Sequence, residues 1–266
     1  MKNRFKSIVA MCTLLVMMCS AFVNADSYSS WKYTGSINGY KYRYRSGIMN
    51  YTGEDQARAH TEVTNGKTAP KGYMAARTYL YQKGGALKAS SSWAKNSSAH
   101  VGIDIAGASY AATSGSYYCI AKFKYKKNST DYSSVYTANK TGNVSPLKAK
   151  SKNTLPSDVI DSMSNVEKEE LSAVIIDKDG FTYGSGLRTL MNLDCPDYIA
   201  AIGEDGVEGY VSSKELAAED DQNATIIEMR PGQRDVRFIN LYSDRGEIIG
   251  KFRIETNCIA LDDKEE

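Results

Sequence analysis

The 266-residue sequence is poor in the residues from which most catalytic and metal centres are built. It has only two histidines, His60 and His100, which lie well apart in the chain. A zinc site needs three or four His, Cys or acidic ligands, and no compact grouping of that kind is evident. There is also no Gly-x-Ser-x-Gly segment of the type that presents a nucleophilic serine. We therefore expect a protein without a catalytic site, cofactor or metal, with a hydrolase of dispersed catalytic residues as a minor alternative.

Cysteine is also scarce, which excludes a disulfide-rich scaffold. Two of the five cysteines precede residue 26, and the other three are Cys119, Cys195 and Cys258. Two readings stay open for these three. Either Cys195 and Cys258 form one bridge, or all three are buried thiols that pack as small apolar side chains.

Long apolar runs are almost absent, and the one that stands out lies at the N-terminus. Ile8 to Met18 is shorter than the roughly 20 residues that a membrane-spanning helix needs. Cations precede this run, and the small residues of Val23-Asn24-Ala25 follow it. This order is typical of a secretory signal peptide. We expect residues 1–25 to be removed and the protein to be secreted, with possible attachment to the cell surface.

Each half of the remaining chain is poor in charges of one sign: the first half has few acidic residues, and the second half has few basic residues. Residues 26–152 carry 19 Lys and Arg against 6 Asp and Glu, a net charge of +13. Residues 153–266 carry 11 against 25, a net charge of −14. Of the 19 tyrosines, 15 fall in the basic half. This split predicts two modules, which either have different partners or dock on each other.

Short segments of alternating polarity dominate residues 26–143 and favour an antiparallel β-sandwich. Tyrosines and cations alternate from Tyr40 to Arg45, and lysines alternate with apolar residues from Tyr117 to Lys126. Gly84-Gly85 separates two strand-like runs, as in a hairpin. Gly53 to Glu62 breaks the pattern, and we expect a helical turn or a loop there.

The cations of these strands are expected on outward faces, where they would form a binding surface. A net charge of +13 exceeds what solubility needs and attracts polyanions. For a secreted protein the expected partner is an anionic cell-wall polymer or a membrane surface. The sequence contains no known motif for contacting bases in the grooves of DNA or RNA, so we expect no nucleic-acid partner. The candidate binding residues are Lys41, Arg43, Arg45, Lys122, Lys124, Lys126, Tyr40, Tyr42 and Tyr44.

The acidic half predicts a small β-rich α+β module over residues 166–257. Residues 144–165 form a predicted linker with a possible short helix, and residues 258–266 form an acidic tail. Two hairpins are expected, one turning at Glu204-Asp205-Gly206 and one at Ser243 to Gly246. In the second hairpin, Val236 and Phe238 are expected to face a core. The predicted fold class is therefore mainly β, an antiparallel β-sandwich followed by the α+β module.

Two segments of the basic half, GYMAARTYLYQKGGALKASSSW and SGSYYCIAKFKY, resemble small secreted β-sandwich proteins of Gram-positive bacteria, including lactococcin-type bacteriocins. This resemblance implies a non-enzymatic, envelope-active or envelope-binding module. The acidic half resembles an uncharacterised extracytoplasmic module of Gram-positive secreted and sensor proteins. That likeness is carried by GFTYGSG, PDYIAAIGEDGVEGYVSSKEL and VRFINLYSDRGEIIGKFRI, and it implies no known chemistry.

Two functions of different kinds follow from these features. The first is a secreted non-catalytic protein that binds anionic cell-envelope components through its basic β-sandwich. The second is a bacteriocin-like secreted toxin whose acidic module restrains the basic module.

Overall fold

The computed structural model describes residues 27–51, 54–64, 66–109, 115–144, 159–217 and 226–259. The predicted signal peptide lies outside the described residues, as do most of the predicted linker and most of the predicted tail. Strands make up 57% of the structure and helices 10%, which confirms the mainly-β class.

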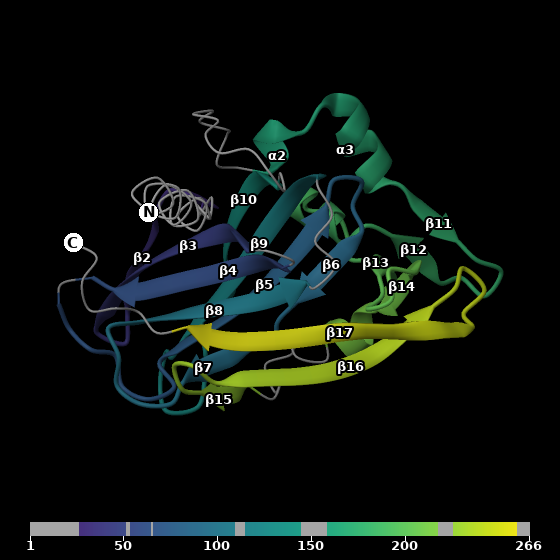
Figure 1. The fold of residues 1–266 in the computed structure, drawn as a ribbon. Coiled ribbons are helices and arrows are strands. Elements are labelled where there is room, and N and C mark those ends of the chain that lie inside the picture. The colour runs from purple at the N-terminus through teal and green to yellow at the C-terminus, as the bar shows by residue number, and fades with distance from the viewer. Residues whose placement is uncertain are drawn as a thin grey trace, which may run out of the picture.

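One layer of antiparallel strands draws on both halves of the sequence (Figure 1). Its order is β2–β3–β4–β8–β17–β16. A two-residue strand, β1 (Ser27–Tyr28), also pairs with β3. The last strand of the chain therefore lies beside β8, with Asn257 opposite Ala106. The bounds are β2 (Lys32–Ile37), β3 (Tyr40–Tyr51), β4 (Glu54–Val63), β8 (Gly102–Ser109), β16 (Arg234–Tyr242) and β17 (Ile248–Ile259).

A second layer packs face to face on the first. Its order is β10–β9–β5, and β5 pairs further with β6 and β7. Inward side chains of both layers, such as Tyr42, Ile105 and Phe123, form a common core. This is the expected sandwich. The bounds are β5 (Met74–Gln82), β6 (Leu87–Ser90), β7 (Ala94–Asn96), β9 (Gly115–Tyr125) and β10 (Tyr136–Val144).

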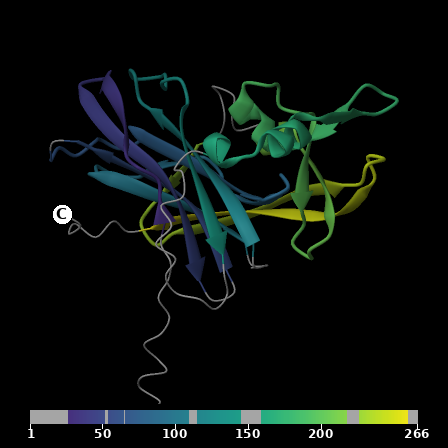
Figure 2. The ribbon, with the colours of Figure 1, turned by 90° about the horizontal axis from the view of Figure 1, so that it is seen from above.

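The remaining elements pack on the outer face of the second layer, pair with its strands β6 and β7, or extend the first layer beyond β16 (Figure 2). Both predicted hairpins are present, as β13–β14 and β16–β17. The elements are α2 (Val159–Ser162), α3 (Asn165–Ser172), β11 (Val174–Ile176), β12 (Thr182–Gly184), the 3₁₀ helix η1 (Gly186–Met191), β13 (Tyr198–Ile202), β14 (Glu208–Ser212), α4 (Ser213–Ala217) and β15 (Ile227–Met229).

The basic and acidic halves share strands and a core. β6 pairs in parallel with β13, and β7 pairs in parallel with β15. The second layer is buried on both faces: Leu80 points into the sandwich, while Tyr79 and Tyr81 pack against Leu187 and Ile199 of the acidic half. Within the described residues, the two halves thus meet in paired strands and in a common core.

A buried arginine links the halves as well. Arg77 on β5 is fully buried, and its guanidinium donates to the carbonyl oxygen of Leu216 at 2.6 Å. It also donates to the carbonyl oxygen of Ser91 at 2.9 Å. Hydrogen bonds of this kind are essential for a charged group that is removed from water.

Two local expectations are wrong. Residues Glu54–Val63 form strand β4, not a helical turn or a loop. Its inward residues are small and its outward residues are polar. Large apolar side chains therefore do not alternate with polar ones along this strand, and the sequence pattern does not reveal it. In β16, Val236 and Phe238 point outward, and the Phe238 side chain is 49% exposed. The neighbouring residues Ile239 and Leu241 take the core face instead.

The three cysteines that the structure describes form no disulfide. Cys119 and Cys258 are buried thiols, while Cys195 is exposed. The bridge between Cys195 and Cys258 is therefore absent, and the expectation of three buried thiols holds for two of them. Burial raises the pKa of the Cys119 thiol and of the Cys258 thiol to about 11, so both are unreactive near neutral pH.

We predict that a chain of residues 26–152 does not fold without residues 153–266. Truncation would expose side chains such as Tyr79, Tyr81 and Ile120, each worth about 1.5–3 kcal/mol when buried. Their sum is comparable with the whole stability of a typical domain, about 5–15 kcal/mol. Circular dichroism and limited proteolysis, with residues 26–266 as the control, test this. Cooperative thermal unfolding of the short chain would contradict it.

Candidate functional site

Strand β3 places its tyrosines and its cations on opposite faces, as the alternation predicts. Tyr42 is fully buried, and its ring stacks on Tyr125 with centroids 4.0 Å apart. Tyr44 is buried beside Phe123. These two tyrosines belong to the core and cannot reach a ligand, which corrects their assignment as binding residues. Tyr40 is half-buried and meets Tyr73 edge to face at 5.5 Å.

The outward arginines of β3 lie beneath aromatic rings from the start of the described chain. The Arg43 guanidinium is 4.4 Å from the Trp31 ring centroid. The Arg45 guanidinium lies 4.0 Å from the Tyr28 ring centroid and 4.1 Å from that of Trp31. Cation–π contacts of this kind hold the aromatic segment against the strand.

A glycine makes room for one of these rings. A Cβ atom at Gly47 would lie 2.6 Å from the ring of Tyr28. The absence of a side chain at this position therefore lets Tyr28 lie flat on β3. From there the Tyr28 hydroxyl donates to Asp104 at 3.0 Å.

Neighbouring strands complete a charged network under the same rings. Arg58 on β4 donates to both carboxylate oxygens of Asp104 on β8, at 3.1 and 2.6 Å. His60 Nε2 is 2.7 Å from Glu62 Oε1, and its Nδ1 is 3.9 Å from Asp104 Oδ2. His60 is 5% exposed and meets Trp31 edge to face at 5.0 Å. Of these partners, only Glu62 is close to His60 along the chain, on the same strand β4. Asp104 lies on β8 and Trp31 precedes β2, so these contacts form only on folding.

This network is structural in character, because the rings of Tyr28 and Trp31 cover the histidine. The hydrogen bond from His60 and the paired Arg43 guanidinium lower the pKa of Glu62 to about 2. Arg43 Nε donates to Glu62 Oε2 at 2.8 Å. Both arginines of β3 are thus engaged inside the molecule.

We predict that Glu62→Gln lowers stability by about 1–2 kcal/mol at neutral pH, after allowance for solvent around a partly exposed pair. A carboxylate with a depressed folded pKa stabilises above its unfolded pKa, near 4.5, and loses that contribution as pH falls toward 2. Guanidinium unfolding at pH 7, 4 and 3 should therefore show the gap between wild type and variant shrinking with acid. Glu169→Gln, at an exposed position of α3, is the control. A gap that stays constant with pH would contradict the prediction.

The three candidate lysines of β9 lie in three different environments. Lys124 is 6% exposed, and its Nζ lies 4.3 Å from the ring centroid of the buried Trp93. Lys122 is half-buried on the outer face of the second layer, with its Nζ 5.2 Å from the Tyr79 ring centroid. Lys126 lies at the end of the strand over Tyr132. Only Lys126 of the three is placed among exposed loops.

Three exposed lysines of the basic half lie at one end of the sandwich, Lys41 at the start of β3 and Lys67 and Lys127 in the loops after β4 and β9, whereas the exposed Lys83 lies in the turn between β5 and β6. The Tyr132 hydroxyl donates to the Gly72 carbonyl oxygen at 2.8 Å, and Thr64 N–H donates to the Lys41 carbonyl oxygen at 2.8 Å. These contacts bring the loops after β2, β4 and β9 together. We define the basic loop surface as Lys41, Lys67, Lys126, Lys127, Tyr40, Tyr73 and Tyr132.

Charge on the basic loop surface is not balanced locally. Lys41, Lys67 and Lys127 are exposed, and none forms an ion pair with another residue that the structure describes. The nearby carboxylate of Asp131 accepts hydrogen bonds from Asn128 and Thr130, which lower its pKa, and the charges of Lys127 and Lys126 lower it further, so Asp131 offsets part of this charge. By contrast, Lys71 and Lys95 pair with Glu228 of the acidic half at 2.7 and 3.5 Å.

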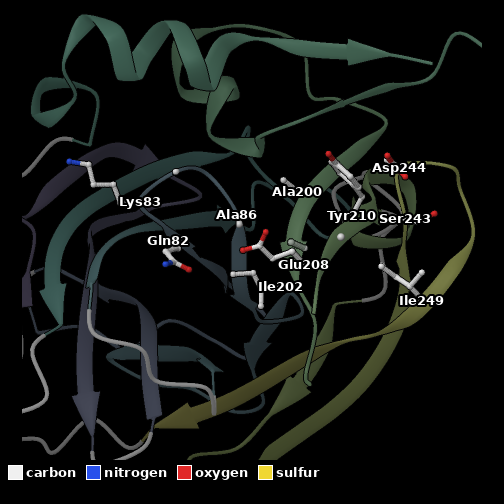
Figure 3. Close-up of a pocket in the computed structure, with 13 residues that line it drawn as sticks. Gln82, Lys83, Ala86, Ala200, Ile202, Glu208, Tyr210, Ser243, Asp244 and Ile249 are labelled. Carbon is white, nitrogen blue, oxygen red and sulfur yellow. The ribbon is translucent and has the colours of Figure 1, made fainter. Parts of the chain in front are cut away.

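A groove of about 550 Å³ lies where the β5–β6 turn meets the acidic half. Figure 3 shows Gln82 and Ala86 on one side, Tyr210 and Asp244 on the other, and Glu208 between them. Ser243 also lines the groove. Its hydroxyl oxygen accepts the N–H groups of Arg245 and Glu247, so it serves the turn between β16 and β17.

Tyr210 connects this groove to an aromatic group that contains all four tyrosines of the acidic half. Tyr183 stacks on Tyr198 with centroids 4.8 Å apart and meets Tyr210 edge to face at 5.0 Å. Tyr198 meets Tyr242 in the same way at 5.5 Å. The group spans β12, β13, β14 and β16, which are neighbours only after folding.

The described residues contain neither a cluster of metal ligands nor a membrane-spanning helix. No three His, Cys, Asp or Glu side chains there come together in a way that could hold a metal ion. Nor does any helix in that part of the chain combine the length and apolar character needed to span a bilayer.

No protein-family model, curated protein or solved structure matches this chain. The function is therefore argued from the residues of the chain itself.

Proposed function

We propose that this protein is a secreted, non-catalytic binding protein that attaches to anionic components of the cell envelope through the basic loop surface. The observation that carries the proposal is a group of exposed lysines that form no ion pair with another described residue: Lys41, Lys67 and Lys127. Tyr40, Tyr73 and Tyr132 lie among them and offer amphipathic rings beside the cations.

The arrangement of charge over the whole molecule supports this choice of surface. Acidic residues lie in the turns of β11–β12 and β16–β17, namely Asp177, Asp179, Asp244 and Glu247. Figures 1 and 2 place these turns at the end of the molecule away from the β2–β3 hairpin. These turns also hold Lys178 and Arg245, so each has a net charge of −1. The basic loop surface is thus the more positive of the two ends, and a difference of this sense orients the protein toward an anionic surface.

The two histidines support a binding role over a hydrolytic one. His60 is covered by Tyr28 and Trp31. His100 Nε2 lies 3.0 Å from the Ser98 hydroxyl on an exposed loop. Among the described residues, no carboxylate hydrogen-bonds to His100, so this pair lacks the third group that orients a catalytic histidine. Export of the protein rests on the leader pattern of residues 1–25.

We predict that the combined substitutions Lys41→Gln, Lys67→Gln and Lys127→Gln weaken binding to purified cell walls or to vesicles rich in anionic lipid by about a hundredfold. Each cation near an anionic surface contributes about 1 kcal/mol, and three together correspond to about two decades in Kd. Co-sedimentation at low and rising salt measures this. Wild-type binding should weaken steadily with salt, because screening shortens the range of the field.

The matched control carries Lys168→Gln, Lys178→Gln and Lys214→Gln, which remove the same charge from the acidic half. Its binding should stay close to that of wild type. Equal losses in both triple variants would point to net charge and not to the basic loop surface. Comparison of walls with vesicles distinguishes wall polymer from lipid as the anionic target. Salt-insensitive binding by wild type would overturn the proposal.

A further inference from the structure

A second cavity, of about 340 Å³, opens between the outer face of the second layer and the acidic half. Its deep wall is formed by side chains that belong to the buried core: Tyr79, Tyr81, Ile120, Ile199 and Leu216. Protein interiors are normally close-packed, with few voids larger than a water molecule. A space of this size with an apolar wall is therefore a site that an apolar group would fill.

The more exposed members of the lining mark the mouth of the cavity. Val135 is 41% exposed, and Thr189 and Cys195 are also exposed. Lys122 lines the same cavity, and its ammonium lies over the Tyr79 ring. The site thus combines an aliphatic and aromatic interior with a single cation, and no acidic side chain is part of the described lining.

We propose that this cavity binds the alkyl chain of a small anionic amphiphile, a medium-chain fatty acid, with its carboxylate beside Lys122. A methylene group occupies roughly the volume of one liquid water molecule, about 30 Å³, so the cavity holds a chain of about ten carbons. The hydrophobic effect drives entry of the chain, and Lys122 favours a negative head group over a positive one. This proposal does not rest on the basic loop surface.

Cys195 provides a native reporter of occupancy, because it lines the cavity and is the exposed thiol of the described chain. Decanoate, kept below its micellar concentration, should slow alkylation of Cys195 by iodoacetamide at least about tenfold, as followed by mass spectrometry. Cys119 and Cys258 are buried and should stay unmodified, which shows that the protein remains folded. Binding should tighten about fourfold with each added methylene from hexanoate to decanoate.

Head-group selectivity tests the role of Lys122. Decyltrimethylammonium carries a chain of the same length with the opposite charge and should protect Cys195 at least tenfold less well than decanoate. Lys122→Gln should abolish this difference while leaving protection by decanol unchanged. Equal protection of wild type by the two charged amphiphiles would overturn the placement of the carboxylate.

Blocking the mouth tests the cavity itself. Thr189→Trp places a bulky ring at an exposed lining position and should remove protection by decanoate. Thr68→Trp, at an exposed position of the basic loop region, is the control and should bind like wild type. Unchanged alkylation of wild-type Cys195 at saturating decanoate would overturn the proposal, whether or not Thr189→Trp folds.

Discussion

The constraint on which the rest of the structure depends is the burial of the second layer on both faces. β5 is buried at every position from Met74 to Tyr81, so it needs a covering layer on each side. The first layer covers one face, and the acidic half covers the other with η1 and β13. Strands that are buried on both faces cannot alternate between apolar and polar residues in the usual way. Because β5 must be covered on both faces, the basic and acidic halves pack together, although they differ in charge and in tyrosine content.

The same constraint explains how a chain with such an uneven charge distribution is held together. Some cations of the basic half are neutralised within the fold, as Arg58 is by Asp104 and Lys71 is by Glu228. Others, such as Arg77, are satisfied by carbonyl oxygens. Among the described residues, Lys41, Lys67 and Lys127 of the basic half are exposed and form no ion pair. Part of the charge difference between the two halves is therefore neutralised by ion pairs inside the fold, and part of it lies on the surface.

Prediction from the sequence succeeds where the signal is local. The strands of the two acidic-half hairpins are found because a turn with Gly and Asp separates two apolar runs, and the alternation of Tyr40 to Arg45 gives the correct faces of β3. The face of β16 is wrong because Val236 and Phe238 compete with Ile239 and Leu241 for the same core. β4 is missed because its inward residues, such as Ala57 and Ala59, are too small to give an apolar period.

The candidate site shows the same limit. Lys41 and Lys126 are predicted because they belong to segments in which residue types alternate regularly. Lys67 and Lys127 lie in loops, where no such alternation occurs. Lys122 lines a cavity whose other wall includes Leu190 and Leu216, which lie far along the chain. Parallel pairings between distant strands, such as β7 with β15, leave no local mark in the sequence.

The pairing of β17 with β8 has a consequence for the order of events during synthesis. Cys258 lies opposite Ile105, about 150 residues later in the chain, and ribosomes add about 5–20 residues per second. The first layer therefore waits roughly 10–30 seconds for its partner strand while its edge at β8 stays open. The first layer can therefore be completed only after β17 has been synthesised, because β17 supplies the strand that pairs with β8.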